Sequence, residues 1–188
     1  MPTEPALPAR ELVDDSLRLR PWQTQDAADL FEAARSSALS VGRWLPWCHT
    51  DYSLDDACAW IRHCQDGWSQ AEHFAFAVFD RGSGELLGAA GLNQRNRVHR
   101  SASLGYWVRQ SRQGEGIAPR AAAMAARFGF DALGLVRIEI VVLPDNKPSR
   151  RVAEKTGAQF EAIARQRLCV NGRAHDAAVY GLIPTDLP

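Results

Sequence analysis

The sequence predicts an α/β fold: one domain with a mixed, mostly antiparallel sheet flanked by helices. Segments with the period of strands alternate with segments with the period of helices along most of the 188 residues. Helical segments between strands require crossover connections, which produce some parallel pairing, whereas tight turns join neighbouring strands in antiparallel hairpins. The length suits one domain, and no linker or internal repeat divides it.

The composition excludes several other classes of protein. With 46% hydrophobic residues the chain is too apolar to be disordered, and 22 basic against 22 acidic residues give no net field toward nucleic acid or an anionic membrane. No apolar run approaches a membrane span, and the N-terminus lacks a signal-peptide pattern, so we expect a cytoplasmic protein. The four cysteines match no zinc template; we interpret them as reduced thiols and expect no metal.

The first third of the chain predicts a strand and two helices after a loose arm. Residues 1–11 hold three prolines and are expected to form this arm, so we place the domain at 12–188. Leu17-Arg18-Leu19-Arg20 alternates like a half-buried strand, and residues 26–35 have helical spacing. Ser53-Leu54-Asp55-Asp56 resembles a capping box that opens a second helix. Two tryptophans of that helix are interpreted as core packing, Trp60 and Trp68.

The middle of the chain predicts three strands. Residues 73–79 form a dense aromatic and β-branched run, which is typical of a buried strand. A turn at 80–84 leads to residues 85–92, which return as its hairpin partner. A further strand at 102–108 follows a basic loop that contains Arg95, Arg97, His99 and Arg100.

The last third predicts, in order, a long helix, a strand, a short helix and the two strands of a hairpin: residues 117–133, 137–142, 144–157, 162–170 and 177–183. Gly134 closes the long helix and Gly157 the short one, because glycine readily takes the left-handed backbone at a helix end. Asn171-Gly172 is the strongest hairpin signal in the chain.

The segment with the most chemical information runs from the strand at Tyr106 into the long helix. Its connecting loop has small residues at Gly114, Gly116 and Ala118. Glycine lets a ligand approach the main chain, and the unpaired amides at a helix start suit a phosphate. The loop is too short for a P-loop and lacks the three-glycine dinucleotide pattern. Alone, it is equally consistent with a tight turn that binds nothing.

Three motifs together resemble one family. Gln113-x-x-Gly116-x-Ala118 resembles the Q/R-x-x-G-x-G/A pyrophosphate loop of the GNAT acetyltransferases, which bind acetyl-CoA. Gly105-Tyr106-Trp107-Val108 resembles the strand before that loop in the RimL/RimJ branch, which acetylates ribosomal-protein N-termini. Asn146-x-x-Ser149-x-x-Val152-Ala153-Glu154-Lys155-x-Gly157 resembles the second cofactor segment of that branch. The resemblance covers residues 17–183 and implies the GNAT fold.

The resemblance implies a set of acetyl-CoA contacts. The CoA pyrophosphate would be held by the Gln113 side chain and by main-chain amides of Gly114, Glu115, Gly116, Ile117 and Ala118. The pantetheine arm would pair with the strand end at Trp107, Val108 and Arg109, where the family splays two parallel strands. Asn146 would bond this arm and Ser149 would lie near the sulfur, which makes both candidate catalytic residues. Candidates for the nucleotide end are Arg150, Arg151 and Lys155, although each is equally consistent with a solvated charge.

Two departures from the family pattern affect the mechanism. Ala153 stands where many GNAT enzymes have a tyrosine acid, so Ser149 is the remaining hydroxyl, and it would stabilise the developing thiolate by a hydrogen bond. Ser103 stands where RimL-like sequences have a glutamate base, and serine is too weak a base for that role. Any base is then water-mediated or one of three other candidates, His99, His175 and Asp176.

A missing strong base favours an acceptor that is itself weakly basic. An α-amine titrates about 2.5 pH units below a lysine amine, so its deprotonation near neutral pH costs roughly 3 kcal/mol less. The family builds its acceptor groove from the first two helices, their connecting loop and the late hairpin. We therefore expect acceptor contacts from Trp44, Trp47, Asn93, Arg95 and Ser103. The basic residues Arg95, Arg97 and Arg100 could equally attract an acidic partner or keep a loop soluble.

The function predicted from these observations is transfer of acetyl from acetyl-CoA to a primary amine in a ternary complex. A peptide or protein N-terminal α-amine ranks first as acceptor, and a small amine such as an aminoglycoside, a polyamine or another antimicrobial ranks second. A non-catalytic acetyl-CoA-binding module and a general phosphate binder are the alternatives from other classes. Family members are often dimers, so a homodimer is a further expectation.

Overall fold

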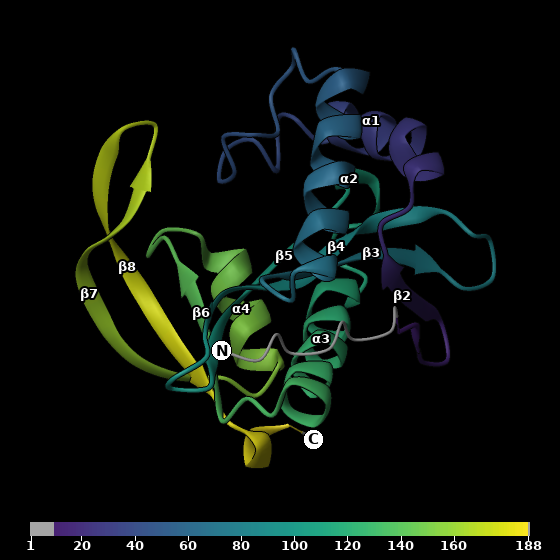
Figure 1. Cartoon of the computed structure of the whole chain (residues 1–188). Helices are drawn as coiled ribbons and strands as arrows, with labels where there is room; N and C mark the ends of the chain where they lie inside the picture. Colours follow the sequence, from purple (N-terminus) through teal and green to yellow (C-terminus); the bar gives the residue numbers. More distant parts are fainter. Residues whose placement is uncertain (1–9, 188) are drawn as a thin grey trace.

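An eight-stranded sheet runs through the molecule in the order β1-β2-β3-β4-β5-β6-β8-β7 (Figure 1). The computed structural model describes residues 10–187. The strands are β1 (Leu12–Val13), β2 (Leu17–Pro21), β3 (Phe74–Asp80), β4 (Leu86–Asn96), β5 (Ser101–Val108), β6 (Arg137–Val142), β7 (Gln159–Val170) and β8 (Arg173–Leu182). Neighbouring strands are antiparallel except β5 and β6, which are parallel. The predicted mixed, mostly antiparallel sheet is therefore confirmed.

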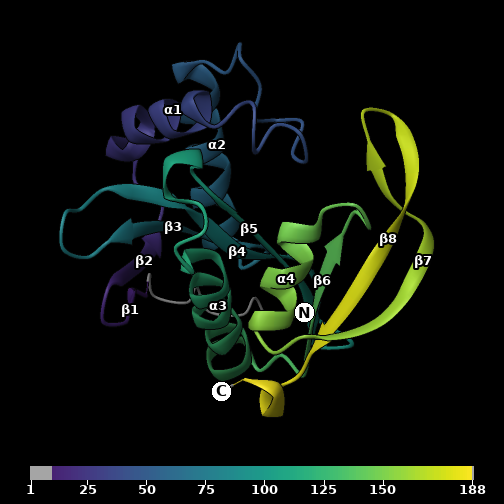
Figure 2. The same cartoon turned by 180° about the vertical axis from the view of Figure 1, so that it is seen from behind.

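Helices cover both faces of this sheet. In the described part of the chain the α-helices are α1 (Ala27–Ser36), α2 (Leu54–Ser69), α3 (Ile117–Leu133) and α4 (Lys147–Lys155). Side chains alternate between the faces of a strand, so Phe74 and Phe76 of β3 pack in the core beneath α3, while Ala77 and Phe79 pack beneath α1 and α2. Figure 2 shows α3 and α4 side by side on their face. None of the described helices is both long and apolar enough to cross a membrane.

Several local signals act as the sequence predicts. Ser53 Oγ accepts a hydrogen bond from the Asp56 amide at 3.2 Å, and the Asp56 carboxylate accepts one from the Ser53 amide at 2.8 Å, so the capping box starts α2. Gly134 ends α3 with a left-handed φ of 62°. Asn171 and Gly172, with φ values of 50° and 73°, join β7 to β8 in a hairpin.

Three differences from the predictions have simple physical causes. β1 is too short to show a periodic pattern, and it was not predicted. β4 continues to Asn96 because the start of β5 pairs with it there, so Arg95 lies in a strand rather than a loop. The prediction of core packing is confirmed for Trp68, which is 7% exposed, but is wrong for Trp60, which is 42% exposed. Residues 1–9 of the predicted arm lie outside the described residues, and Arg10 and Glu11 are exposed.

The sheet opens between its two parallel strands. β5 and β6 pair only where residues 101–103 meet residues 137–139, and they diverge beyond Ser103. The main-chain edge of β5 from residue 104 onward consequently faces a gap instead of a neighbouring strand. This confirms the predicted splay, and it fixes the place of the cavity described below.

Candidate active site

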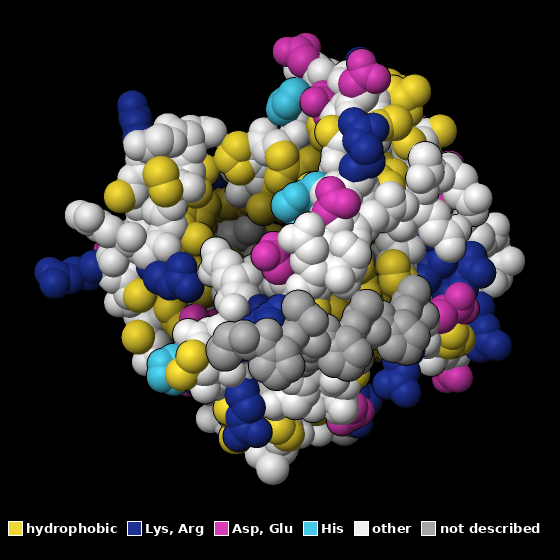
Figure 3. Space-filling view, in the orientation of Figure 1, with side chains coloured by type: hydrophobic (Ala, Val, Ile, Leu, Met, Phe, Trp, Pro, Cys, Tyr) yellow, Lys and Arg dark blue, Asp and Glu magenta, His cyan; other side chains and the backbone are white. Residues whose placement is uncertain are grey.

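A cavity of about 1790 Å³ occupies the opening between β5 and β6. Figure 3 shows the hollow between α2 and the β7–β8 hairpin, with many hydrophobic side chains along its walls. At one end it reaches the loop before α3 and the first turn of α4, and at the other it reaches α2 and the ends of β3 and β4. The cavity thus joins the predicted cofactor segments to the predicted acceptor groove.

The loop before α3 presents an open stretch of main chain to the cavity. Gly114 and Gly116 have left-handed φ values of 87° and 75°, and Gly116 is the N-cap of α3. A Cβ atom built on either glycine would meet no heavy atom within 4 Å among the described residues. The glycines are therefore required by backbone conformation, and the space beside them is free for a ligand at the positive end of a 17-residue helix.

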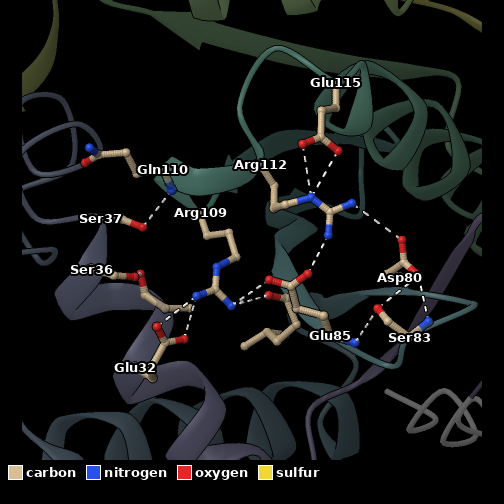
Figure 4. Close-up of polar contacts among 12 residues, drawn as sticks. Glu32, Ser36, Ser37, Asp80, Ser83, Glu85, Arg109, Gln110, Arg112 and Glu115 are labelled. Carbon is tan, nitrogen blue, oxygen red and sulfur yellow. Dashed lines mark hydrogen bonds and ion pairs between the residues drawn. The ribbon is translucent and has the colours of Figure 1, made fainter.

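Two arginines brace this loop from behind. Arg109 donates from Nη2 to both oxygens of Glu32 on α1, at 2.8 and 2.6 Å, and lies 3.2 Å from Glu85 (Figure 4). Arg112 donates from Nε to Glu115 at 3.0 Å and also pairs with Glu85. Carboxylates thus hold both guanidinium groups, which ties the loop to α1 and to the start of β4. The side chains of Arg109 and Glu115 consequently point away from the cavity, which neither residue lines.

Only part of the predicted strand end offers its main chain to the opening. The Arg109 amide donates to Leu87 O on β4 at 2.8 Å. Peptide groups alternate between the two edges of a strand, so those of Trp107 also face β4, while those of Val108 and Tyr106 face the gap. Val108 O accepts a hydrogen bond there from Gln113 Nε2 at 3.0 Å. The predicted main-chain contact is therefore limited to Val108, and Trp107 lines the cavity with its indole.

The first turn of α4 places Asn146 and Ser149 at the cavity wall. Asn146 is the N-cap residue, and its Oδ1 accepts a hydrogen bond from the Ser149 amide at 3.2 Å. Because this cap uses the side-chain oxygen, the NH₂ group of Asn146 is the part left to donate to a ligand. Arg151 and Lys155, one turn apart, also line the cavity, whereas Arg150 turns away to bond Tyr180 Oη at 2.9 Å.

Sequence reasoning missed Tyr106 as a site residue. Its hydroxyl donates to Ser149 O at 2.9 Å and lies 3.2 Å from Ser149 Oγ, so it joins β5 to α4 across the opening. Burial raises the pKa of Tyr106 to about 12, and the phenol therefore stays neutral near neutral pH. The available signal was that a tyrosine on the core face of a strand needs a polar partner for its hydroxyl. Ala153, at the position of the family's usual tyrosine, is fully buried.

The acceptor end of the cavity is walled by aromatic rings. Trp44 and Trp47 line it, as predicted, and Trp47 makes edge-to-face contacts with Trp107 at 5.4 Å and Tyr52 at 5.8 Å. The exposed Trp60 lines it as well, which explains why this side chain is not in the core.

The predicted polar acceptor residues divide into two groups. Asn93 and Arg95 line the cavity, and Arg95 Nη1 also donates to Ala71 O, just after α2, at 3.1 Å. Ser103 does not line it, because its hydroxyl turns to Gln94 Oε1 at 3.1 Å. The candidate bases His99, His175 and Asp176 are also outside the lining. The histidines that do line it are His49, His63 and His73, which sequence reasoning did not select.

Small residues form the floor between the aromatic walls. Ala75, Gly91 and Gly105 are paired side by side across β3, β4 and β5, on the face covered by α2. A Cβ on Gly91 would come within 2.8 Å of Ala75 Cα, so glycine is needed for the strands to fit. A Cβ on Gly105 would meet only Asn93 Nδ2, at 3.9 Å. We call Ala75, Gly91 and Gly105 the small-residue floor; it ends at the strand whose edge is open.

Comparisons with known proteins converge on one family. A family model described as "Acetyltransferase (GNAT) domain" matches residues 16–159. "Putative ribosomal N-acetyltransferase YdaF" of Bacillus subtilis (strain 168) is 30% identical over 176 residues, which cover 91% of this chain and 93% of that protein. Spermidine N(1)-acetyltransferase of Escherichia coli (strain K12) is 27% identical over 164 residues, which cover 86% of this chain and 83% of that protein. A solved structure named "putative ribosomal-protein-serine acetyltransferase" from Vibrio cholerae matches with a TM-score of 0.84 and 32% identity, over 94% of this chain and 99% of that one.

Proposed function

The chain belongs to the GNAT acetyltransferase family, N-acetyltransferases that use acetyl-CoA, and from this premise we propose that it acetylates the α-amino group of a peptide or protein N-terminus. The observation that carries the proposal is the single cavity that joins the glycine loop, through the gap between β5 and β6, to an aromatic-walled acceptor end. One cavity with two ends suits direct transfer between two bound substrates, because it aligns the amine with the acyl carbon.

The residues present fit acetyl-CoA along one side of this cavity. The open main chain at Gly114 and Gly116 suits the pyrophosphate, because its amides lie at the N-terminus of α3. Further along, Val108 has its amide on the open edge of β5, beside the carbonyl oxygen that Gln113 bonds, and Asn146 offers its side-chain NH₂ group. Arg151 and Lys155 add positive charge to the same wall. We expect acetyl-CoA to be bound in this direction, with its thioester near Ser149.

The chain's own groups would then assist the departure of sulfur. Acetyl-CoA supplies an activated thioester when it is bound. The Ser149 hydroxyl can turn from Tyr106 Oη toward the sulfur and donate a hydrogen bond to the charge that develops there. The Tyr106 hydroxyl continues to donate its hydrogen bond to Ser149 O, and this bond holds the first turn of α4 in place.

The preference for an α-amine rests on the missing carboxylate at Ser103 and on two of the relatives. A serine at this position takes no proton, so the acceptor must lose its proton to another group or to water. An α-amine loses its proton at a cost that is roughly 3 kcal/mol below that of a lysine amine. The names of the Bacillus subtilis and Vibrio cholerae proteins, both referring to ribosomal acetylation, support the same acceptor class.

A panel of amines tests this proposal. The purified protein is incubated with acetyl-CoA and one of three acceptors: the peptide amide Ser-Ala-Ala-Ala-NH₂, Nα-acetyl-lysine methylamide, or spermidine. Release of CoA thiol and the mass of the product are measured. We expect the peptide to be acetylated fastest. Acetylation of spermidine alone would instead favour the polyamine alternative, which the Escherichia coli relative supports. Saturable acetyl-CoA binding with no turnover on any amine would favour a non-catalytic module.

A further inference from the structure

Three aromatic rings contact one another in turn along the α2 side of the acceptor end. The His63 ring lies 5.4 Å from the Trp60 ring and 4.4 Å from the His73 ring, with interplanar angles of 37° and 23°. Trp60 and His63 are one turn apart on α2, and His73 comes just before β3. All three line the cavity, and Figure 3 shows histidine and acidic side chains at the α2 edge of the hollow. We call Trp60, His63 and His73 the ring stack.

The ring of His73 is held in its neutral form. Burial lowers the pKa of His73, and the neighbouring His63 lowers it further, while Glu72 acts in the opposite direction. Its Nε2 atom is buried and has no hydrogen-bond partner within residues 10–187, so an added proton there would bury an unpaired N–H group. The ring fits against α2 only because residue 67 is glycine, since a Cβ at Gly67 would lie 2.0 Å from it.

His63 is the member of the stack that can exchange a proton with the cavity. Its side chain is exposed, and imidazole is the side chain that gains and loses a proton near neutral pH. Its ring contacts the ring of Trp60 and is stacked on that of His73. The other ionisable groups that line this end are Asp56 on α2 with His49 near it, Glu72, and the arginines Arg95 and Arg97.

The small-residue floor connects the ring stack to the open edge of β5. Ala75, Gly91 and Gly105 carry almost no side chain, so an amine can lie between α2 and the sheet and reach Gly105. Gly105 lies two residues beyond Ser103, where pairing with β6 stops. The amine would therefore meet the acyl group at the gap, in the same cavity that His63 lines.

We propose that His63 is the general base that takes the proton from the acceptor ammonium, with Trp60 and His73 as positioning residues. This rests on the proposed function. In the step, the ammonium N–H bond breaks and its proton moves to an imidazole nitrogen of His63. The free amine then attacks the thioester carbon, the C–N bond forms, the C–S bond breaks and the thiolate leaves. The nitrogen of the new amide then gives up its extra proton, which neutralises the thiolate as the CoA thiol. His63 releases the first proton to solvent, so the reaction releases one net proton.

The test is the pH dependence of His63→Gln on Ser-Ala-Ala-Ala-NH₂. About one α-amine in ten is already neutral at pH 7, so losing the base should lower kcat by up to roughly tenfold at that pH, with little change in the KM for acetyl-CoA. At pH 9 most α-amines are neutral without help, so the loss should shrink to less than about twofold. His99→Gln, in an exposed turn outside the cavity, is the matched control and should keep full activity at both pH values.

A second variant separates the roles of the two histidines. His73→Phe keeps a ring at this position but removes its ability to take a proton. Its kcat should therefore vary with pH in the same way as that of the wild type. The proposal would be overturned if kcat of His73→Phe no longer varied with pH as it does in the wild type. It would also be overturned if His63→Gln lowered kcat by the same factor at pH 7 and at pH 9. Unfolding temperatures of all variants show whether each is folded.

The outcome also distinguishes the inference from the proposed function. If spermidine is acetylated and the peptide is not, the proposed acceptor is wrong, and His63 is tested on spermidine. About one amine in 25 is neutral at pH 9 when the amine is as basic as that of lysine, so the His63→Gln loss should then stay above about tenfold even at that pH. If no amine in the panel is acetylated, the proposed function and the inference both fail.

Discussion

Replacing Gly116 with alanine tests the anion site at the start of α3, and Gly134 provides a matched control. The two glycines cap opposite ends of the same helix, with left-handed φ values of 75° and 62°. A Cβ at either position would meet no heavy atom within 4 Å among the described residues. Gly116→Ala and Gly134→Ala therefore carry a similar backbone penalty, but only the first places a methyl group in the cavity.

The expected magnitudes follow from this geometry. A left-handed conformation costs a residue with a side chain about 1–2 kcal/mol, which lowers the unfolding temperature of a chain of this size by about 2–8 °C in both variants. In Gly116→Ala the methyl group would also keep a pyrophosphate from one charge-assisted hydrogen bond, which contributes about 1.5–3 kcal/mol. That corresponds to a loss of acetyl-CoA affinity of roughly 10- to 150-fold.

Calorimetric titration with acetyl-CoA and thermal unfolding measure the two effects separately. We expect equal unfolding temperatures for the two variants, with weakened binding in Gly116→Ala alone. Unchanged affinity in Gly116→Ala would refute the assignment of the loop as the pyrophosphate site. Equal loss of affinity in both variants would show that binding depends on the stability of α3 and not on the space beside Gly116.

Four further substitutions probe the rest of the cavity. Ser149→Ala should lower kcat about tenfold without changing acetyl-CoA affinity, because it removes one hydrogen bond to the departing sulfur; an equal change in both quantities would count against this role. Tyr106→Phe should cost about 1 kcal/mol of unfolding free energy, measured by denaturant titration; since burial raises the pKa of Tyr106 to about 12, no loss of wild-type activity from its ionisation is expected below pH 10. Trp60→Ala should change stability by less than about 1 kcal/mol, since the ring is 42% exposed, but should raise the KM for the acceptor. Arg112→Gln should weaken acetyl-CoA binding a few-fold, measured by titration, because the loop loses its ties to Glu85 and Glu115.

The fold could be predicted because its elements have strong local signals. The capping box at Ser53, the glycine that ends α3 and the Asn171-Gly172 turn each act through their own few residues. For Trp60, helical periodicity was not enough to predict whether the side chain is buried. At 100° per residue it lies about 40° from Cys64, at the edge of the apolar stripe of α2. A residue at that edge can face either the core or a cavity, and the packing of α2 on the sheet decides which.

The site could be predicted only where its residues lie in one segment. The glycine loop and the N-terminus of α4 are local motifs, and the structure brings both to one cavity. The contact between Tyr106 and Ser149 spans 43 residues, and it depends on how α4 packs beside β5. His63 and His73 were missed for a similar reason. The candidates His99 and His175 belong to a loop and a hairpin, whereas the lateral position of α2 determines which histidines face the acceptor end.

The alternation of β5 explains how one strand can serve both substrates of the proposed reaction. Tyr106 points to the face covered by α3 and α4, where it meets Ser149, while Gly105 belongs to the opposite face, beneath α2. Peptide groups of the same strand face the gap left by β6, where an extended, amide-bearing arm can pair with them. In the proposed reaction the sulfur and the amine would thus come to opposite faces of one strand, and the acyl carbon would lie between them. A register slip of one residue would exchange these faces, placing a tyrosine in the path of the amine and a glycine opposite Ser149. The glycine at position 91 is needed for the strands to pack, and in the proposed reaction Gly105 would also leave room for the amine.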